Sequence, residues 1–209
     1  YTVITQEKSA TRVWNALQKK VSKITCNMIT YAWISELEGS DELIMRYIRK
    51  IFDNKVSIEM NFGDPDVLKL HQTAKKVSHE RHYLVQFVRF QKAADDIFFA
   101  PVSPQYNALP LTINHFADRF SDQKWIIYDL KRKYGFYYDL HTVTEMTLDN
   151  NDNFLDGKLD EKLMAEDEKL FQELWKGYFK ALTIKERINL KLQRQHMPKR
   201  FWKLLTEKQ

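Results

Sequence analysis

The spacing of apolar residues changes twice along this chain of 209 residues, and that change constrains the fold more than any single motif. Over the first 80 residues, apolar side chains recur every three or four positions, as at Leu43 and Tyr47, which predicts helices. Between residues 83 and 148, β-branched and aromatic residues gather in short runs bounded by turn residues, which indicates strands. The helical spacing resumes from residue 159. We therefore expect an α+β protein with N-terminal helices, a small central sheet and C-terminal helices.

Helix signals are clearest at three places in the first part of the chain. Apolar residues from Ala10 to Ile24 recur at helical spacing, and a second helix is expected to be capped by Ser40. The sequence Asp64-Pro65-Asp66 predicts a third start, because an acidic N-cap residue is followed by proline at the first helical position. We expect a further short helix over Tyr31–Leu37.

The sheet is expected to follow a β-β-α-β-β order. A hairpin would join Tyr83–Gln91 to Ile97–Val102, and a helix would open at Pro110. Because strands joined by short turns pair antiparallel, the simplest arrangement is a small antiparallel sheet with helices on one face. The later two strands are expected over Trp125–Leu130 and Phe136–Leu140, and Thr142–Leu148 is a candidate for a further strand.

Length and composition favour a single domain over residues 1–209. With 44% hydrophobic residues, the chain can build one sizeable core. We divide it into a helical part (1–82), a sheet part (83–148) and a second helical part with a basic tail (149–209). Because the chain opens on Tyr1 rather than Met, we expect it to be a piece of a longer polypeptide.

Cys26 is the one cysteine of the chain, which excludes an internal disulfide and favours an intracellular, cytoplasmic location. Its apolar neighbours predict a buried, inert thiol rather than a nucleophile. No apolar run approaches the roughly 20 residues that span a bilayer, and no secretory signal is recognised. We therefore expect a soluble protein without a membrane partner.

Charge is segregated within the last third of the chain. Residues 149–173 carry nine acidic and three basic side chains, a net charge of −6, whereas residues 180–209 carry nine basic and two acidic ones, a net charge of +7. The chain as a whole has a net charge of only +5. A distribution this one-sided steers a charged partner toward one end of the molecule.

The basic segment is the candidate interface for nucleic acid. If residues 184–196 form one helix, its apolar residues share one stripe and its basic residues lie on the opposite face. Past Pro198, which must break the helix, cations flank flat rings, a combination that suits phosphate together with an unstacked base. The alternative is a solvated helix face with Phe201 and Trp202 folded back into the core. The candidate contacts are Arg187, Lys191, Arg194, Lys199, Arg200, Trp202 and Lys203.

No motif for catalysis is recognised, and we expect neither a metal nor a cofactor. Glycine-rich phosphate loops, nucleophile elbows and cysteine cluster sites do not occur. Residues 149–160 resemble a calcium loop, but Phe154 stands where the loop needs glycine. The histidines at 79 and 82 have a spacing compatible with metal ligation but more typical of an ordinary helix end. The side chains that remain as candidates for catalysis are His79, His82, His115 and Asp129.

Short segments from about residue 7 to the C-terminus together carry a family resemblance. They are Asn61–Asp66, Val77–Arg81, Phe87–Phe90, Asn107–Leu111, His115–Phe116 with Arg119–Phe120, Trp125–Arg132, Leu174–Trp175 with Tyr178–Phe179, and Arg194–Trp202. Through them the chain resembles a bacterial family described as a DNA metabolism protein, a domain of unknown function. The resemblance implies an upstream strand and helix, a context of DNA repair or modification, and a radical-SAM protein of DNA modification or repair as a partner. Similar modules occur fused to uracil-DNA glycosylases, but the resemblance supplies no catalytic residues.

Taken together, these features predict an accessory nucleic-acid-binding module of DNA repair or modification that acts with the radical-SAM partner. DNA, or RNA, would be bound through the basic segment. Two alternatives stay open. One is a protein-interaction scaffold for that partner without direct DNA binding, and the other is a nucleic-acid-processing enzyme of unrecognised type.

Overall fold

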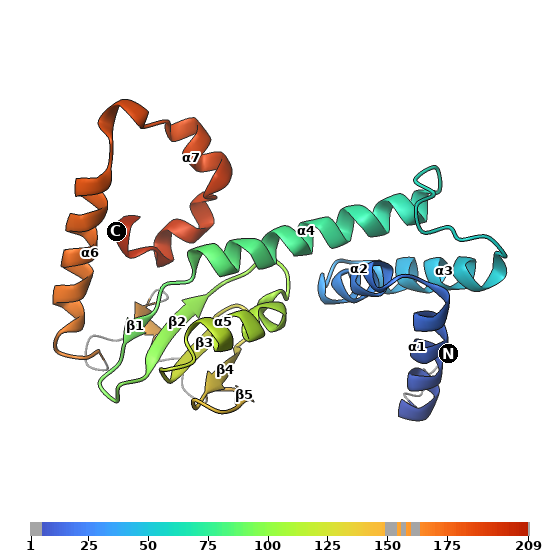
Figure 1. Ribbon diagram of the computed structural model, residues 1–209, viewed down its shortest axis with the longest axis horizontal. Coiled ribbons are helices and arrows are strands. Elements are labelled where there is room, and N and C mark those ends of the chain that lie inside the picture. The colour runs from blue at the N-terminus through green and yellow to red at the C-terminus, as the bar shows by residue number, and fades with distance from the viewer. Residues whose placement is uncertain (1–5, 149–153, 156–157, 160–163, 209) are drawn as a thin grey trace. The chain divides into compact units, whose positions relative to one another are not determined.

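The computed structural model describes residues 6–148, 154–155, 158–159 and 164–208. The α+β class expected from the sequence is confirmed: N-terminal helices precede a central five-stranded sheet, and C-terminal helices follow it (Figure 1). The chain forms two compact units. The first comprises residues 1–80 and 106–108, and the second comprises residues 81–105 and 109–209.

Helices build the first unit. They are α1 (Glu7–Lys20), α2 (Lys23–Ile34), α3 (Ser40–Asp53) and the first part of α4 (Pro65–Phe87). Each contributes to one hydrophobic core, in which Leu17, Ile29, Tyr47 and Leu70 are almost completely buried. This burial follows the helical spacing of the apolar residues, because positions three and four apart share one face of a helix.

Local signals decide where these helices begin. Ser22 interrupts the helix expected from Ala10 to Ile24, since its Oγ accepts a hydrogen bond from the Thr25 amide at 3.2 Å and starts α2. The short helix expected over Tyr31–Leu37 is wrong: α2 already includes Tyr31 and ends at Ile34, and a turn leads to Gly39 at φ 75°. With Ser40 as the N-cap, as predicted, the first helical residue would be Asp41. Helix α3 instead starts at Ser40 itself, one residue earlier.

Helix α4 starts where the sequence predicts and ends later. The Asp64 carboxylate accepts from the amides of Asp66 and Val67 at 2.8 and 3.4 Å, which confirms the expected N-cap. The strand expected over Tyr83–Gln91 is wrong, because α4 continues to Phe87. Tyr83 and Phe87 lie one turn apart on this helix and their rings stack at 5.9 Å between centroids, so packing overrides their preference for strands.

The central sheet has the strand order β1-β2-β3-β4-β5. It is mixed rather than wholly antiparallel, because β2 and β3 pair in parallel with Ala100 opposite Ile127, while the other neighbours are antiparallel. Parallel neighbours require a crossover, and the turn η1 (Leu109–Thr112) with helix α5 (Ile113–Arg119) supplies it. The strand bounds are β1 Gln91–Lys92, β2 Phe98–Val102, β3 Trp125–Asp129, β4 Tyr134–Tyr138 and β5 Val143–Met146.

At β2 and β3, side chains are buried on both faces of this sheet. On one face, Trp125 of β3 contacts Phe116 of α5 and Phe90, with ring centroids 6.4 Å apart in each pair. On the other, Phe99 and Tyr128 are buried in a cluster that includes Met164. The edge strand β1 is also covered, since the Ala165 amide donates to the Lys92 carbonyl at 3.0 Å. Covering an edge in this way removes a template for pairing with another chain.

The C-terminal segment turns back on itself within the second unit. A two-stranded sheet of β6 (Phe154–Leu155) and β7 (Lys158–Leu159) precedes α6 (Glu168–Leu182). After α6, the chain forms three short helices and returns, so that the last turn, η6 (Thr206–Lys208), lies beside α6 (Figure 1). Among the described residues, no helix is long and apolar enough to cross a membrane.

Candidate functional site

The six basic candidates of the C-terminal segment are all exposed. Arg187 lies on η4 (Lys185–Arg187), Lys191 and Arg194 on α7 (Leu190–His196), and the other three on η5 (Lys199–Leu204). These short helices follow one another along the chain, and Pro198 separates the last two as the sequence predicts. The cations are therefore distributed over three consecutive elements rather than along one helix face.

Residues 184–196 do not form the single helix considered above. The chain is extended at Ile188 and Asn189, and the Asn189 side chain caps α7 by accepting from the Leu192 amide at 3.0 Å. The apolar side chains of this stretch line a groove of about 630 Å³ instead of forming a stripe, with Arg187 and Lys208 also in the lining. The asparagine is the local cause, since its side chain replaces the backbone bond that would continue a helix.

The aromatic pair of η5 is divided between the core and the surface. Phe201 is buried and its ring lies 5.6 Å from that of Tyr83 and 5.3 Å from that of Phe87. Trp202 is half-buried, and its indole N–H donates to the Met197 carbonyl at 3.0 Å. The ammonium group of Lys208 stands 5.3 Å from the Trp202 ring centroid, as in a cation–π contact. One face of this ring is thus already occupied by a cation.

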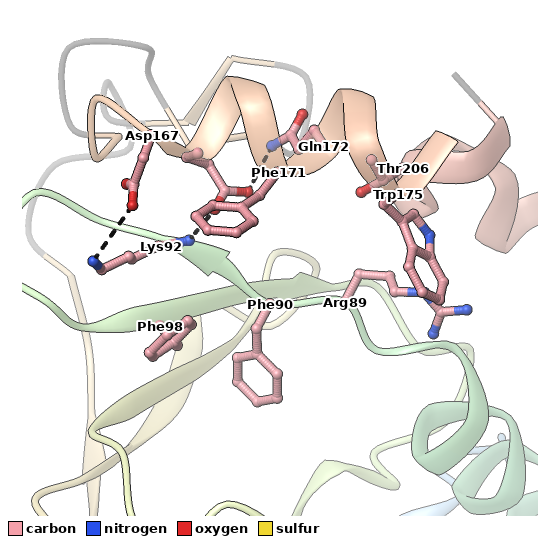
Figure 2. A pocket seen from close by; sticks show the side chains of 10 residues that line it. Arg89, Phe90, Lys92, Phe98, Asp167, Phe171, Gln172, Trp175 and Thr206 are labelled. Atoms are coloured by element: carbon pink, nitrogen blue, oxygen red, sulfur yellow. Dashed lines mark hydrogen bonds and ion pairs between the residues drawn. The ribbon is translucent and has the colours of Figure 1, made fainter. Parts of the chain in front are cut away.

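A second feature of the same unit is an aromatic cleft of about 760 Å³. It lies between the strand pair β1–β2 and helix α6, and Figure 2 shows Phe171 pointing from α6 toward the strands. Lys92 and Asp167 occupy one end, and Arg89, Trp175 and Thr206 the other (Figure 2). The complete lining, which we call the aromatic cleft, is Arg89, Phe90, Lys92, Phe98, Asp167, Glu168, Phe171, Gln172, Trp175 and Thr206.

Glu207 fixes one end of the aromatic cleft. Its side chain is only 2% exposed, and its carboxylate accepts from Arg89 Nη2 at 2.7 Å and from Trp175 Nε1 at 3.1 Å. Burial alone would raise the pKa of this carboxyl, but the hydrogen bonds from Arg89, the backbone and Trp175 outweigh it and lower the pKa. The ionised glutamate therefore ties the end of the chain to α6 and to the segment that leads into β1.

Glu168 forms the wall at the other end. It is 7% exposed, and its carboxylate accepts from the Lys92 amide at 2.9 Å and from the Gln172 side-chain amide at 2.8 Å. Lys92 in turn pairs with Asp96 at 3.0 Å and approaches Asp167 at 3.9 Å. The buried charge is thus matched by hydrogen-bond donors, as a stable buried carboxylate requires.

The histidine candidates are not drawn into the aromatic cleft. His79 belongs to the first unit and is exposed. In the second unit, His82 Nε2 contacts the Gln86 side-chain amide at 2.9 Å, and the His115 ring meets the edge of Phe116. None of these side chains appears among the described residues that line the cleft.

The buried side chain of Asp129 has a structural role. It is fully buried at the end of β3, and its carboxylate accepts from the Lys131 and Arg132 amides at 2.9 and 3.2 Å and from the Arg132 guanidinium at 2.8 Å. These bonds hold the turn between β3 and β4, in which Lys133 has φ 59°. The Asp129 carboxylate therefore stabilises this turn.

Neither metal ligands nor reactive thiols form a further site among the described residues. The described part of the chain contains no group of three or more His, Cys, Asp or Glu side chains suited to a metal ion. Most of the calcium-like loop at 149–160 lies outside the described residues. Cys26 is buried as expected, and burial raises the pKa of its thiol, which lowers its reactivity.

Sequence reasoning missed the aromatic cleft. Its residues come from three stretches of the chain, around 90–98, 167–175 and 206, and no local motif joins them. Phe171 and Trp175 have the helical spacing typical of core residues, yet they are 57% and 40% exposed. The composition of α6 alone did not indicate that the face with Phe171 and Trp175 remains exposed to solvent.

A family model described as a domain of unknown function, DUF4130, matches residues 38–207. No curated protein and no solved structure matches the chain.

Proposed function

The chain belongs to the DUF4130 family, and we propose that it is an accessory nucleic-acid-binding module that holds a phosphate chain through its C-terminal segment. The observation that carries the proposal is the common exposure of the cations on η4, α7 and η5. Phosphate contacts from exposed lysine and arginine release counterions, which supplies most of the free energy of non-specific binding. The residues assigned to this contact are Arg187, Lys191, Arg194, Lys199, Arg200 and Lys203.

Three cations of this segment, Arg187, Lys191 and Arg194, are exposed and available to a partner. Within the part of the chain that the structure describes, no carboxylate lies within ion-pair distance of Arg187, Lys191 or Arg194. Arg200 makes cation–π contacts with Phe201 and Tyr83 at 4.5 and 5.8 Å, which orient its guanidinium. A cation that is already oriented loses less side-chain entropy when it binds phosphate.

A salt titration tests the proposal. If six phosphates are neutralised, log K for an oligonucleotide falls against log[salt] with a slope of about −4 to −5. The paired substitution Lys191→Ala/Arg194→Ala should weaken binding to all sequences alike and make the slope shallower by about 1.4 to 1.8. Fluorescence anisotropy of a labelled oligonucleotide at several salt concentrations measures both quantities.

A charge-matched control separates local contacts from net charge. Lys75 and Lys76 are exposed on α4 in the first unit, and Lys75→Ala/Lys76→Ala removes the same charge from another surface. We expect this variant to keep the slope of the unmodified protein. Equal losses in the two double variants, or no salt-dependent binding at all, would contradict the assignment.

The resemblance noted from the sequence supports a biological context for this binding. It suggests that the module acts in DNA repair or modification and presents nucleic acid to a radical-SAM partner enzyme. A specific observation favours a protein partner as well: several large aliphatic side chains along α6 and α7 are at least half exposed. They are Leu170, Leu174, Leu182, Leu190 and Leu192.

The second candidate function is therefore a protein-interaction scaffold for that partner. Co-purification of the two proteins after nuclease treatment, retained in the Lys191→Ala/Arg194→Ala variant and lost in Leu174→Ala/Leu182→Ala, would favour the scaffold. Dependence of co-purification on added nucleic acid would favour the binding module.

A further inference from the structure

The aromatic cleft exposes flat rings to solvent. Phe171 and Trp175 lie four residues apart on α6 and therefore on one face, with 57% and 40% of their surface exposed. Tyr178, which does not line the cleft, has its ring centroid 5.8 Å from that of Trp175 and is 56% exposed. Aromatic rings usually bury most of their surface in a folded protein, so the two open rings of Phe171 and Trp175 in a concave site indicate a flat binding partner.

The ring of Trp175 is held in place before any ligand arrives. Its indole N–H is bound to the buried Glu207 carboxylate, which Arg89 also binds. Arg89 is fixed further by donating from Nη1 to the carbonyls of Gln86 and Val88 at 3.0 and 3.2 Å. A preorganised ring loses little conformational entropy when another ring stacks on it.

The same end of the cleft has an unused donor. Arg89 Nε is buried and has no hydrogen-bond partner among the described residues. A buried donor without an acceptor is costly. Gln172, one turn from Glu168, adds a carboxamide to the lining; its Nε2 donates to Glu168, and its oxygen is an acceptor suited to a base edge.

We propose that the aromatic cleft receives an unstacked nucleobase of a single-stranded nucleic acid, with the base on Phe171 and Trp175 and the adjoining backbone toward Arg89. This inference rests on the proposed function, because the strand would be held by the basic segment. The two features are continuous: Thr206 lines the cleft two residues after η5 ends at Leu204, and η5 carries Lys199, Arg200 and Lys203.

Charge decides the direction in which the strand runs. The end near Asp167 and Glu168 carries two carboxylates, whereas its one ammonium, that of Lys92, also pairs with Asp96, so a phosphate there would be repelled. The end near Arg89 leads to the cations of η5. The backbone therefore leaves the cleft at the Arg89 end, and the acidic end admits only the uncharged base.

A comparison of two oligonucleotides tests the inference on the unmodified protein. One is a short thymidine oligomer, and the other has the same length and phosphates but abasic sugars throughout. Since stacking on an aromatic side chain contributes about 1–3 kcal/mol per base, the abasic strand should bind at least about fivefold more weakly at equal salt. A duplex of the same length should also lack the stacking contribution to binding, because its bases are already stacked on one another.

Two substitutions at equally exposed residues show which side chain causes the difference in affinity between the two strands. Phe171→Ala removes a ring of the cleft, whereas Leu170→Ala removes a neighbouring side chain that is also 57% exposed but does not line the cleft. We expect Phe171→Ala to reduce the difference between the two strands to less than about twofold, since most of the stacking contribution is lost, and Leu170→Ala to preserve it. Circular dichroism and thermal melting establish that both variants are folded.

The outcomes separate this inference from the proposed function. If the unmodified protein binds both strands equally well and with the same salt dependence, the basic segment still holds nucleic acid and the base site is rejected. If neither strand binds at low salt, the proposed function fails and the base site with it. If Leu170→Ala removes the difference as fully as Phe171→Ala does, the outer face of α6 rather than the cleft is responsible, which also overturns the assignment.

Discussion

At the scale of single residues, Gly135 shows how little space separates two strands of the sheet. It lies in β4 opposite Tyr128 of β3, and a Cβ atom there would stand 2.5 Å from the Ile127 carbonyl oxygen and 2.9 Å from the Tyr128 ring. The strand predicted from the sequence starts one residue after this glycine, at Phe136. The structure instead includes it in the strand, because close approach of the two backbones requires a residue without a side chain.

We expect Gly135→Ala to destabilise the protein by about 1–3 kcal/mol, since the backbone must move to admit the methyl group. Urea unfolding measures the change in free energy. Gly177→Ala is the matched control, because Gly177 lies in α6 and a methyl group added there would meet no atom within 4 Å. At that position the same change should raise stability by up to about 1 kcal/mol through helix propensity. Similar effects in both variants would show that space around Gly135 is not limiting.

At the scale of elements, α4 shows which boundary a sequence can predict. Its start is encoded by adjacent residues, because Asp64 bonds to amides two and three positions further on. Its end depends on packing, since Phe87 and Tyr83 contact Phe201, which lies more than a hundred residues away in the sequence. Aromatic residues in isolation favour strands, but here the contact with Phe201 stabilises the helical conformation.

Removing the cap of α4 should cost stability. We expect Asp64→Ala to lower the free energy of unfolding by about 0.5–2 kcal/mol, because two amide donors lose their acceptor. Asp64→Asn separates this effect from the ion pair with Lys50 at 2.6 Å, since asparagine caps as well as aspartate but carries no charge. The ion pair is partly exposed and contributes little, so Asp64→Asn should remain near the unmodified protein in thermal or urea unfolding. If Asp64→Ala and Asp64→Asn lowered the free energy of unfolding equally, the charge of Asp64 rather than its capping hydrogen bonds would be the source of the stability.

At the scale of the whole chain, one buried carboxylate connects distant segments of the second unit. Glu207 binds Arg89, 118 residues earlier in the sequence, and Trp175 of α6. The bond holds the last turn of the chain against α6, and the basic segment lies between these two points. The placement of the cations and the shape of the aromatic cleft therefore depend on the same contact.

The lowered pKa of Glu207 predicts a pH dependence. A carboxyl with a folded pKa below its unfolded value stabilises the protein above the unfolded pKa, and this contribution disappears as pH falls through the folded pKa. We expect Glu207→Gln to lower the free energy of unfolding by about 1.5–3 kcal/mol at about pH 7, because charged hydrogen bonds are lost. The difference between the two proteins should shrink below about pH 4.3, the ordinary value for glutamate. Urea unfolding from about pH 3 to about pH 7 measures it, and a difference that stays constant with pH would contradict an ionised Glu207 in the folded protein.

The sequence by itself determined the α+β class, the start of α4, the break at Pro198 and the segregation of charge in the last third of the chain. The first three depend on residues within about four positions of one another, where periodicity and capping act, and the charge segregation follows from the composition of two segments. Local rules also predicted the helix whose apolar residues Ile113 and Phe116 are both buried, but α5 starts at Ile113 and not at Pro110, which lies in η1.

Tertiary structure alone decided the parallel pairing of β2 with β3, the C-terminal end of α4 and the existence of the aromatic cleft. The physical reason is that each depends on contacts between segments far apart in the chain. The free energy of such contacts cannot be predicted from a local sequence pattern. The exposure of Phe171 and Trp175 illustrates this, because helical spacing predicts which residues share a face but not whether another element covers that face.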